Sequence, residues 1–322
     1  DKKYKALIMY NFCTYFDINY ISHGLSLFKS IIKHSEEPIN FYVLCLDEKT
    51  FQVLTDQKNK NLIPLKLSDI ENEYSELLEA KKNRSRIEYY FTLSPILPLY
   101  LIEKLQLDLI ASIDADLMFF SSPTPIFQEM GEHSIYITEH RFREKFKSHE
   151  IAGKYNVQCQ IFRNDKWGLS CLERWKDQCI DWCFDKFEND KFADQKYLDE
   201  WPSRYKNHIV VSENIGIGVA PWNIEGENIS IRDKQFFINQ KPIIFYHFHG
   251  LKIFNKYLAK TGLSGFHAKL TSPVKGLYLN YLNELSSNAI PIKKKEIRPG
   301  NYGNIRLIMS GIKYRDLILN FS

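Results

Sequence analysis

The sequence lacks an apolar run long enough to cross a bilayer as a helix, which takes about 20 consecutive residues. It also lacks a Cys-x-x-Cys pair, and Cys179 and Cys183 lie one turn apart on one predicted helix face. We therefore interpret the six cysteines as reduced, mostly buried thiols rather than zinc ligands. The charged opening DKKYK is unlike a secretory signal peptide. These absences predict a globular cytoplasmic protein.

A strong excess of charge is missing as well, because the net charge is only +4. It is unevenly placed: residues 251–322 hold 12 Lys or Arg and 3 Asp or Glu, which gives +9 there and −5 over the preceding residues. An acidic body is unsuited to a nucleic-acid groove, so we expect no nucleic-acid partner. The basic tail suits an anionic membrane surface; a helix packed on the domain with a solvated basic face is an equal alternative. Its densest cluster is Lys293, Lys294, Lys295 and Arg298.

Short apolar runs alternate with amphipathic stretches along the first part of the chain. Residues 4–10, 40–47 and 107–114 have the composition of buried strands, and residues 21–34 have helical spacing of apolar side chains. This alternation predicts an α/β fold with a mostly parallel central sheet flanked by helices. In such sheets ligands bind beyond the carboxyl ends of the strands.

Asp114 and Asp116 stand at such an end, directly after the third run. In an extended segment, side chains two residues apart point to the same face. Two carboxylates on one face repel unless a cation lies between them, and Mg²⁺ or Mn²⁺ is held by oxygen ligands that include substrate phosphates. An isolated Asp-x-Asp is more often a solvated loop. The preceding apolar strand favours a metal site here.

Further candidates follow along the chain. His247 and His249 end a late apolar strand, where an imidazole can be a third metal ligand or simply pack in the core. Lys252 can meet a phosphate. Asp194 and Gln195 suit sugar hydroxyls or acid–base chemistry, although Asp194 could equally cap a helix.

In this order, the segments SIDADLMFF, YNVQCQIFRND, FADQKYLDEWP and HFHGLK resemble the GT-A fold nucleotide-sugar glycosyltransferases. The nearest comparison is glycosyltransferase family eight, with the related bacterial surface-polysaccharide enzymes. The resemblance covers roughly residues 4–252. It implies a Mn²⁺ (or Mg²⁺) site made by Asp114, Asp116 and His247, with His249 as the alternative to His247. Lys252 follows the His-x-x-Gly motif more closely than the corresponding Lys does in the family, and the Pro-Trp that normally follows is missing.

The resemblance also assigns the donor site. Residues 10–17 would be the first strand-to-helix loop and hold the base, and Arg86 would reach the diphosphate. This loop lacks the family's Ala-Asp pair, so a UDP-sugar is favoured and a GDP-sugar stays open. The donor-binding residues implied are Asn11, Phe12, Tyr15, Arg86, Asp114, Ala115, Asp116, Gly250 and Lys252.

Asp194, Gln195 and Asn156 would face the donor sugar as the catalytic residues. The implied activity is that of a hexosyltransferase-type glycosyltransferase (EC 2.4) that retains configuration and acts on a glycan or lipid-linked acceptor. Lipopolysaccharide or capsule assembly, with peripheral association at the inner face of the bacterial membrane, is the expected setting. A nucleotidyltransferase is disfavoured because the first loop has no glycine; a non-catalytic sugar-nucleotide binding protein is the other alternative.

We expect two parts in the chain. Residues 1–272 would form the GT-A catalytic domain, with a donor-binding half over about 1–125 and a sugar/acceptor half over about 126–272. Residues 273–322 would be a basic helical C-terminal extension.

Overall fold

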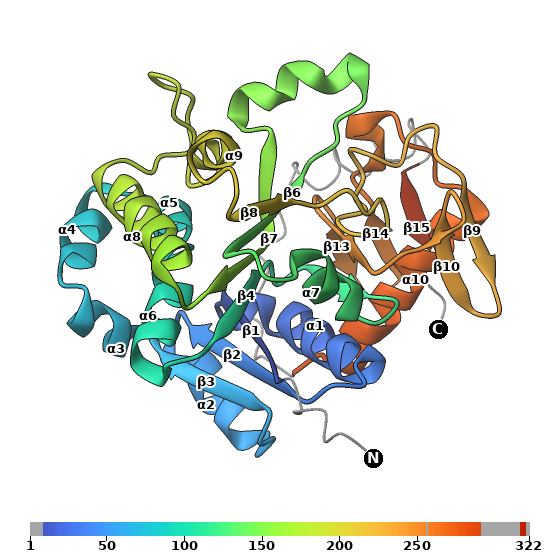
Figure 1. Ribbon diagram of the computed structural model, residues 1–322. Coiled ribbons are helices and arrows are strands. Elements are labelled where there is room, and N and C mark those ends of the chain that lie inside the picture. Colours follow the sequence, from blue (N-terminus) through green and yellow to red (C-terminus); the bar gives the residue numbers. More distant parts are fainter. Residues whose placement is uncertain (1–8, 256, 291–315, 320–322) are drawn as a thin grey trace, which may run out of the picture.

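The structure is a computed structural model that describes residues 9–255, 257–290 and 316–319. Its centre is a seven-stranded sheet (Figure 1). Four of its pairings are parallel (β3–β2, β2–β1, β1–β4 and β6–β8), and β7 runs antiparallel to both of its neighbours. The predicted α/β class with a mostly parallel sheet is confirmed. In spatial order the strands are β3 (Leu62–Lys66), β2 (Ile39–Cys45), β1 (Tyr10–Phe16), β4 (Leu109–Ile113), β7 (Tyr155–Arg163), β6 (Ile135–Glu139) and β8 (Ile209–Val211).

The first strand differs from the prediction. Residues 10–17 were expected to be a loop, but Tyr10–Phe16 pairs with β2 along its whole length and forms β1. The polar Asn11 obscured this strand in the sequence. The side-chain Nδ2 of Asn11 donates to Leu109 O at 3.2 Å, and its Oδ1 accepts from Nδ2 of Asn40 at 3.1 Å. Its side-chain polar atoms are therefore satisfied inside the sheet. The strand predicted over residues 4–10 lies largely outside the described residues.

Helices cover both faces of the sheet, which explains why its strands are apolar on both sides. One face packs against α1 (Ile21–His34), α2 (Glu48–Asp56) and α7 (Thr124–Met130). The other packs against α3 (Leu67–Glu73), α4 (Glu76–Asn83), α5 (Arg86–Thr92), α6 (Ile96–Leu105) and α8 (Lys166–Asp181). All six cysteines are buried free thiols, and Cys171 and Cys179 pack in the second core from α8.

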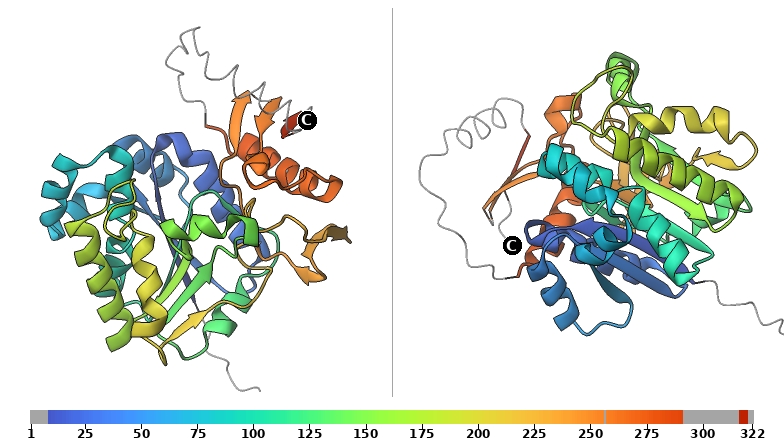
Figure 2. Two further views of the ribbon diagram at one scale, coloured as in Figure 1. Left: turned by 90° about the horizontal axis from the view of Figure 1, so that it is seen from above. Right: turned by 90° about the vertical axis from the view of Figure 1, so that its left-hand side faces the viewer.

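A third core lies beside the sheet and is built mostly from the C-terminal half, together with Met118 and Phe120. The long helix α10 (Ser272–Ser287) is the central element of this core and runs alongside α1 (Figure 2). Asn288 joins these helices: it accepts from Lys29 and donates to Ser26 Oγ at 3.0 Å. The strands of this part are β5 (Leu117–Phe119) with β12 (Phe245–His247), β9 (Ile229–Arg232) with β10 (Gln235–Ile238) and β11 (Lys241–Pro242), and β13 (Lys252–Asn255) with β14 (Leu258–Lys260) and β15 (Leu317–Leu319).

Short helices connect these parts: η1 (Ile18–Tyr20), η2 (Glu144–Ala152), η3 (Lys196–Glu200), α9 (Trp201–Arg204) and η4 (Leu263–Phe266). Over the described ranges, no helix has the length and apolar character needed to cross a membrane. The basic cluster at residues 293–298 lies outside the described residues. The division at residues 272 and 273 stays a prediction.

Candidate active site

The two aspartates lie in the turn between β4 and β5. Asp114 N donates to Gln158 O at 3.1 Å, which continues the pairing of β4 with β7. β5 then pairs antiparallel with β12, and this register sets His247 opposite Leu117. Phe248 N donates to Asp116 O at 3.1 Å and closes the arrangement. Backbone pairing therefore brings a histidine from late in the chain next to the two carboxylates.

The three side chains form a compact group. Nε2 of His247 lies 3.1 Å from Oδ1 of Asp116 and 3.9 Å from Oδ2 of Asp114. In the part of the chain that the structure describes, these three residues form a group whose ligand atoms lie within 4.8 Å of one another. Two carboxylates and one imidazole are a suitable donor set for Mn²⁺ or Mg²⁺. The group has the character of a divalent metal site.

A glutamine orients the histidine. Nδ1 of the buried His247 lies 3.0 Å from Oε1 of Gln158, which leaves Nε2 directed at the carboxylates. Gln158 is held in turn by Thr138 Oγ1 at 3.3 Å. The alternative ligand, His249, is not part of the group, and its ring centroid lies 5.7 Å from that of His247. The geometry favours His247.

The charges of this group depend on one another. Burial lowers the pKa of His247, but the carboxylates of Asp116 and Asp114 outweigh it and raise that pKa. Burial raises the pKa of Asp114, whereas the attraction of His247 outweighs burial at Asp116 and lowers the pKa of that carboxylate. Two partly buried carboxylates thus need a positive partner, which a divalent cation would supply.

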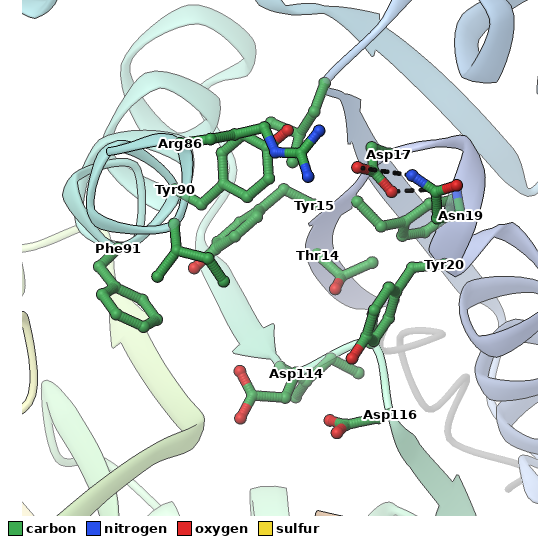
Figure 3. Close-up of a pocket in the computed structure, with 15 residues that line it drawn as sticks. Thr14, Tyr15, Asp17, Asn19, Tyr20, Arg86, Tyr90, Phe91, Asp114 and Asp116 are labelled. Carbon is green, nitrogen blue, oxygen red and sulfur yellow. Dashed lines mark hydrogen bonds between the residues drawn. The ribbon is translucent and has the colours of Figure 1, made fainter. Parts of the chain in front are cut away.

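A cavity of about 470 Å³ opens above Asp114, Ala115 and Asp116 (Figure 3). This size is within the range of small-molecule sites. Its wall carries Arg86 from the first turn of α5, and the guanidinium group extends over the cavity. Tyr15, from the end of β1, also lines it. The structure thus brings together five of the predicted donor-binding residues.

Sequence reasoning missed two aromatic side chains in this wall. Tyr20 follows β1 in η1, is 48% exposed, and points its hydroxyl toward Asp116 (Figure 3). Tyr90 faces the same cavity from α5. The signal available in the sequence was proximity to candidates already named: Tyr20 comes three residues after the segment 10–17, and Tyr90 comes four residues after Arg86.

Some predicted contacts are not brought to this cavity. Asn11 and Phe12 lie within β1, and the Phe12 ring is buried in the first core. Gly250 has a positive φ of 75° in the turn after β12. Lys252 is exposed at the start of β13, opposite Lys260. Arg84, which lies two residues before Arg86 and was not a predicted contact, is buried and donates to Thr92 Oγ1 and Ile180 O.

Asp194 belongs to a buried polar chain. Ser94 Oγ donates to Asp194 Oδ2 at 2.5 Å, and it lies 2.9 Å from the hydroxyl of Tyr15. Burial raises the pKa of Asp194 to about 6, although the Ser94 hydrogen bond opposes the shift. Its negative charge in turn raises the pKa of Asp114. The side chain does not cap η3, whose N-cap is Gln195, so the capping alternative is wrong.

The other two predicted catalytic side chains have partners within the protein. Asn156 is buried on β7, and its Oδ1 accepts from Gln158 N at 2.7 Å. Gln195 Nε2 donates to Ala152 O at 3.1 Å, and its side chain lies against Gly153. Gln195 thereby connects the segment after Asp194 to the end of η2.

This fold is shared with known enzymes. The crystal structure of galactosyltransferase LgtC in complex with donor and acceptor sugar analogues matches 89% of this chain and 99% of its own, with a TM-score of 0.55 and 16% sequence identity. The chain therefore has the GT-A fold of glycosyltransferases, which confirms the predicted fold.

Sequence comparison identifies nearer relatives. No family model matches the chain. It is 31% identical over 249 residues to the uncharacterized protein YfnD of Bacillus subtilis (strain 168), which covers 76% of this chain and 78% of that protein. It is also 31% identical over 251 residues to the uncharacterized protein YfnF of the same strain, covering 75% and 82%. The chain belongs to the family that contains YfnD and YfnF.

Proposed function

We propose that this protein is a metal-dependent glycosyltransferase that moves a sugar from a nucleoside-diphosphate sugar to a glycan or lipid-linked acceptor. The observation that carries the proposal is the group of Asp114, Asp116 and His247 at the edge of a cavity of about 470 Å³. The group stands at the carboxyl end of β4, where open α/β sheets bind ligands.

The donor set fits a hard divalent cation, Mn²⁺ or Mg²⁺, held by Asp114, Asp116 and His247. A bound cation would stabilise the negative charge of the departing nucleoside diphosphate. Arg86 would add a guanidinium fork suited to phosphate oxygens. Gly250 and Lys252 follow β12 and are proposed to approach the same phosphates from the other side of the turn.

The aromatic part of the cavity would hold the nucleoside. Tyr20 and Tyr90 offer ring faces on which a base can stack. A uracil base is favoured and guanine is the alternative. Tyr15 also lines the cavity, and because its hydroxyl lies 2.9 Å from Oγ of Ser94, its ring rather than its hydroxyl would meet the base.

The sugar would lie between the metal group and Asp194, whose charge acts on Asp114. We assign Asp194 to the sugar hydroxyls, with Asn156 and Gln195 beside it, and expect the anomeric configuration to be retained. A carboxyl with a raised pKa can accept or give a proton near neutral pH, so Asp194 also suits a proton-transfer role.

The first experiment is a thermal-stability panel with UDP, GDP, CMP and ADP, each with and without Mn²⁺. A ligand that binds only the folded protein raises the apparent melting temperature. A shift that needs Mn²⁺ and disappears in Asp114→Ala is expected for one nucleoside diphosphate. Asp56→Asn, an exposed acid at the end of α2, is the control and should keep the shift.

Product analysis separates the alternatives. A glycosyltransferase releases a nucleoside diphosphate from the donor, whereas a nucleotidyltransferase releases inorganic diphosphate from a nucleoside triphosphate. A binding protein releases neither. Inactivity with every nucleotide sugar, together with an unchanged panel for Asp114→Ala, would overturn the proposal.

The acceptor is proposed to be lipid-linked and the setting to be lipopolysaccharide or capsule assembly at the inner face of the membrane. The support is the net charge of +9 over residues 251–322. Juxtamembrane basic residues contribute about 1 kcal/mol each near an anionic leaflet.

A further inference from the structure

Unpaired buried polar atoms gather around the candidate metal group. Within the described ranges, six buried side-chain nitrogen or oxygen atoms have no hydrogen-bond partner. Three of them belong to His23 of α1, Tyr281 of α10 and Trp222, which precedes β9. The Trp222 ring lies 5.2 Å from the ring of His247. Because nearly all buried polar groups are paired in native proteins, such a concentration indicates a partner that is not part of the chain.

His23 and Tyr281 form one wall beside Asp116. The fully buried Tyr281 stacks on Phe248 at 3.9 Å, and the backbone nitrogen of Phe248 donates to Asp116 O. The His23 ring lies 6.0 Å from that of Tyr281 and stacks on Tyr20 at 4.6 Å. Tyr20 lines the cavity, so this wall lies beside Asp116 and directly behind the ring of Tyr20.

The charge of Asp116 acts on both members of the wall. Burial raises the pKa of Tyr281, and the charge of Asp116 raises it further. Burial lowers the pKa of His23, and Asp116 opposes that shift. The unpaired atoms, Nδ1 of His23 and the hydroxyl of Tyr281, thus stand in the field of a candidate metal ligand without bonding to it.

We propose that His23 and Tyr281 donate hydrogen bonds to phosphate oxygens of the nucleoside diphosphate. This inference rests on the proposed function. Phosphate oxygens only accept, and hydroxyl and imidazole N–H groups are suitable donors that form strong bonds to charged acceptors. The diphosphate is the part of the donor that shares a cation with Asp116. These two donors would add to the contact proposed for Lys252, which is exposed on β13.

The test compares two tyrosines of one helix. Tyr281→Phe removes an unpaired hydroxyl, so the variant should be at least as stable as the wild type without ligand. Tyr278→Phe is the control: Tyr278 is equally buried on α10, but its hydroxyl donates to Thr261 O at 3.1 Å and lies 3.2 Å from that of Tyr246. It should lose stability and keep nucleotide affinity.

Affinity is measured by calorimetry for UDP and GDP with Mn²⁺, and for Mn²⁺ alone. Tyr281→Phe and His23→Phe should each weaken binding of the preferred nucleotide about tenfold and leave the affinity for Mn²⁺ alone unchanged. Unchanged nucleotide affinity in both variants would overturn the inference and show that water satisfies these atoms. An equal loss for Mn²⁺ alone would also overturn it, because the residues would then act on the metal.

Inorganic diphosphate with Mn²⁺ separates this inference from the proposed function. If it binds the wild type and is weakened in Tyr281→Phe while no nucleotide binds, the phosphate contact stands and the proposed function fails. If nucleotides bind the wild type and both variants with the same affinity, the proposed function stands and the phosphate contact fails. If neither probe binds the wild type, both fail.

Discussion

Gln158 illustrates how a side chain with no assigned role in its sequence segment can control a site. Its carbonyl oxygen lies 3.0 Å from Nδ1 of His247, and this contact selects the nitrogen that faces the carboxylates. Nothing in the sequence distinguishes it from Gln160, two residues along the same strand and similarly buried. The two glutamines differ only in the tertiary structure, where His247 of β12 lies against Gln158 of β7 and Gln160 bonds to Asn156 O.

Gln158→Met should weaken Mn²⁺ binding about 10- to 100-fold, because the His247 ring loses the acceptor that orients it. Calorimetric titration with Mn²⁺ measures the loss. Gln160→Met is the matched control, since Gln160 donates to Asn156 O rather than to the metal group. Equal affinities in the two variants would contradict the orienting role.

Asp194 predicts a pH dependence of stability. Its folded pKa is about 6, above the usual value of about 4 in an unfolded chain. The folded protein therefore holds more protons at this residue between pH 4 and 6. Its contribution to stability is present below pH 4 and is lost as the pH rises through 6. Relative to Asp194→Asn, the wild type should lose about 2 kcal/mol of unfolding free energy from pH 4 to pH 7.

Urea unfolding at four pH values between 4 and 7 measures this difference. Ser94→Ala removes the hydrogen bond that opposes the shift, so it should move the window to higher pH. A difference between wild type and Asp194→Asn that does not change with pH would show that the carboxyl titrates normally.

At the scale of elements, the beginning of α5 positions the cavity wall. A capping box starts this helix: Glu88 N donates to Ser85 Oγ, and Ser85 N donates to Glu88 Oε2 at 2.7 Å. Arg86 is the first residue after the cap, and Tyr90 follows one turn later. The cap therefore fixes the turn from which both side chains reach the cavity.

Ser85→Ala should lower the free energy of unfolding by about 1 kcal/mol and also weaken nucleotide binding, because the first turn of α5 frays. Thermal unfolding and nucleotide titration measure the two effects. Asp165→Ala removes the N-cap of α8, where Asp165 Oδ1 accepts from Trp167 N and Gly168 N at 2.9 Å. It should cost similar stability but leave binding intact. Parallel losses of affinity in both variants would argue against a local effect.

At the scale of the whole molecule, the end of the chain returns to the fold. β15 pairs with β14, and the buried Asp316 accepts from Ser264 Oγ at 2.6 Å. Removing residues 291–322 would therefore delete a strand together with the basic cluster. Charge substitution is the cleaner test of membrane association.

A variant with Lys293, Lys294, Lys295 and Arg298 changed to Gln should lose sedimentation with anionic vesicles at low salt, since each charge contributes about 1 kcal/mol near the surface. Its melting temperature should match the wild type. The control changes four exposed lysines of the body to Gln: Lys33, Lys49, Lys58 and Lys60. Sedimentation of the first variant at the wild-type level would count against the membrane proposal.

The sequence by itself determined the α/β class, the strands β2 and β4, and the carboxylate pair at the end of β4. These depend on local patterns of apolar and polar residues, which are read within one segment. It did not find β1, because Asn11 and Thr14 interrupt the apolar pattern and are accommodated only by neighbouring strands. A sheet covered on both faces relaxes the alternation that marks a strand in the sequence.

Only the tertiary structure decided which histidine joins Asp114 and Asp116, because the pairing of β5 with β12 sets it. Only the packing of α1 on α10 set His23 beside Tyr281, from opposite ends of the chain. Contacts between distant segments depend on the register of paired strands and on which helix faces pack together. The residues next to a side chain in the sequence do not determine either of these.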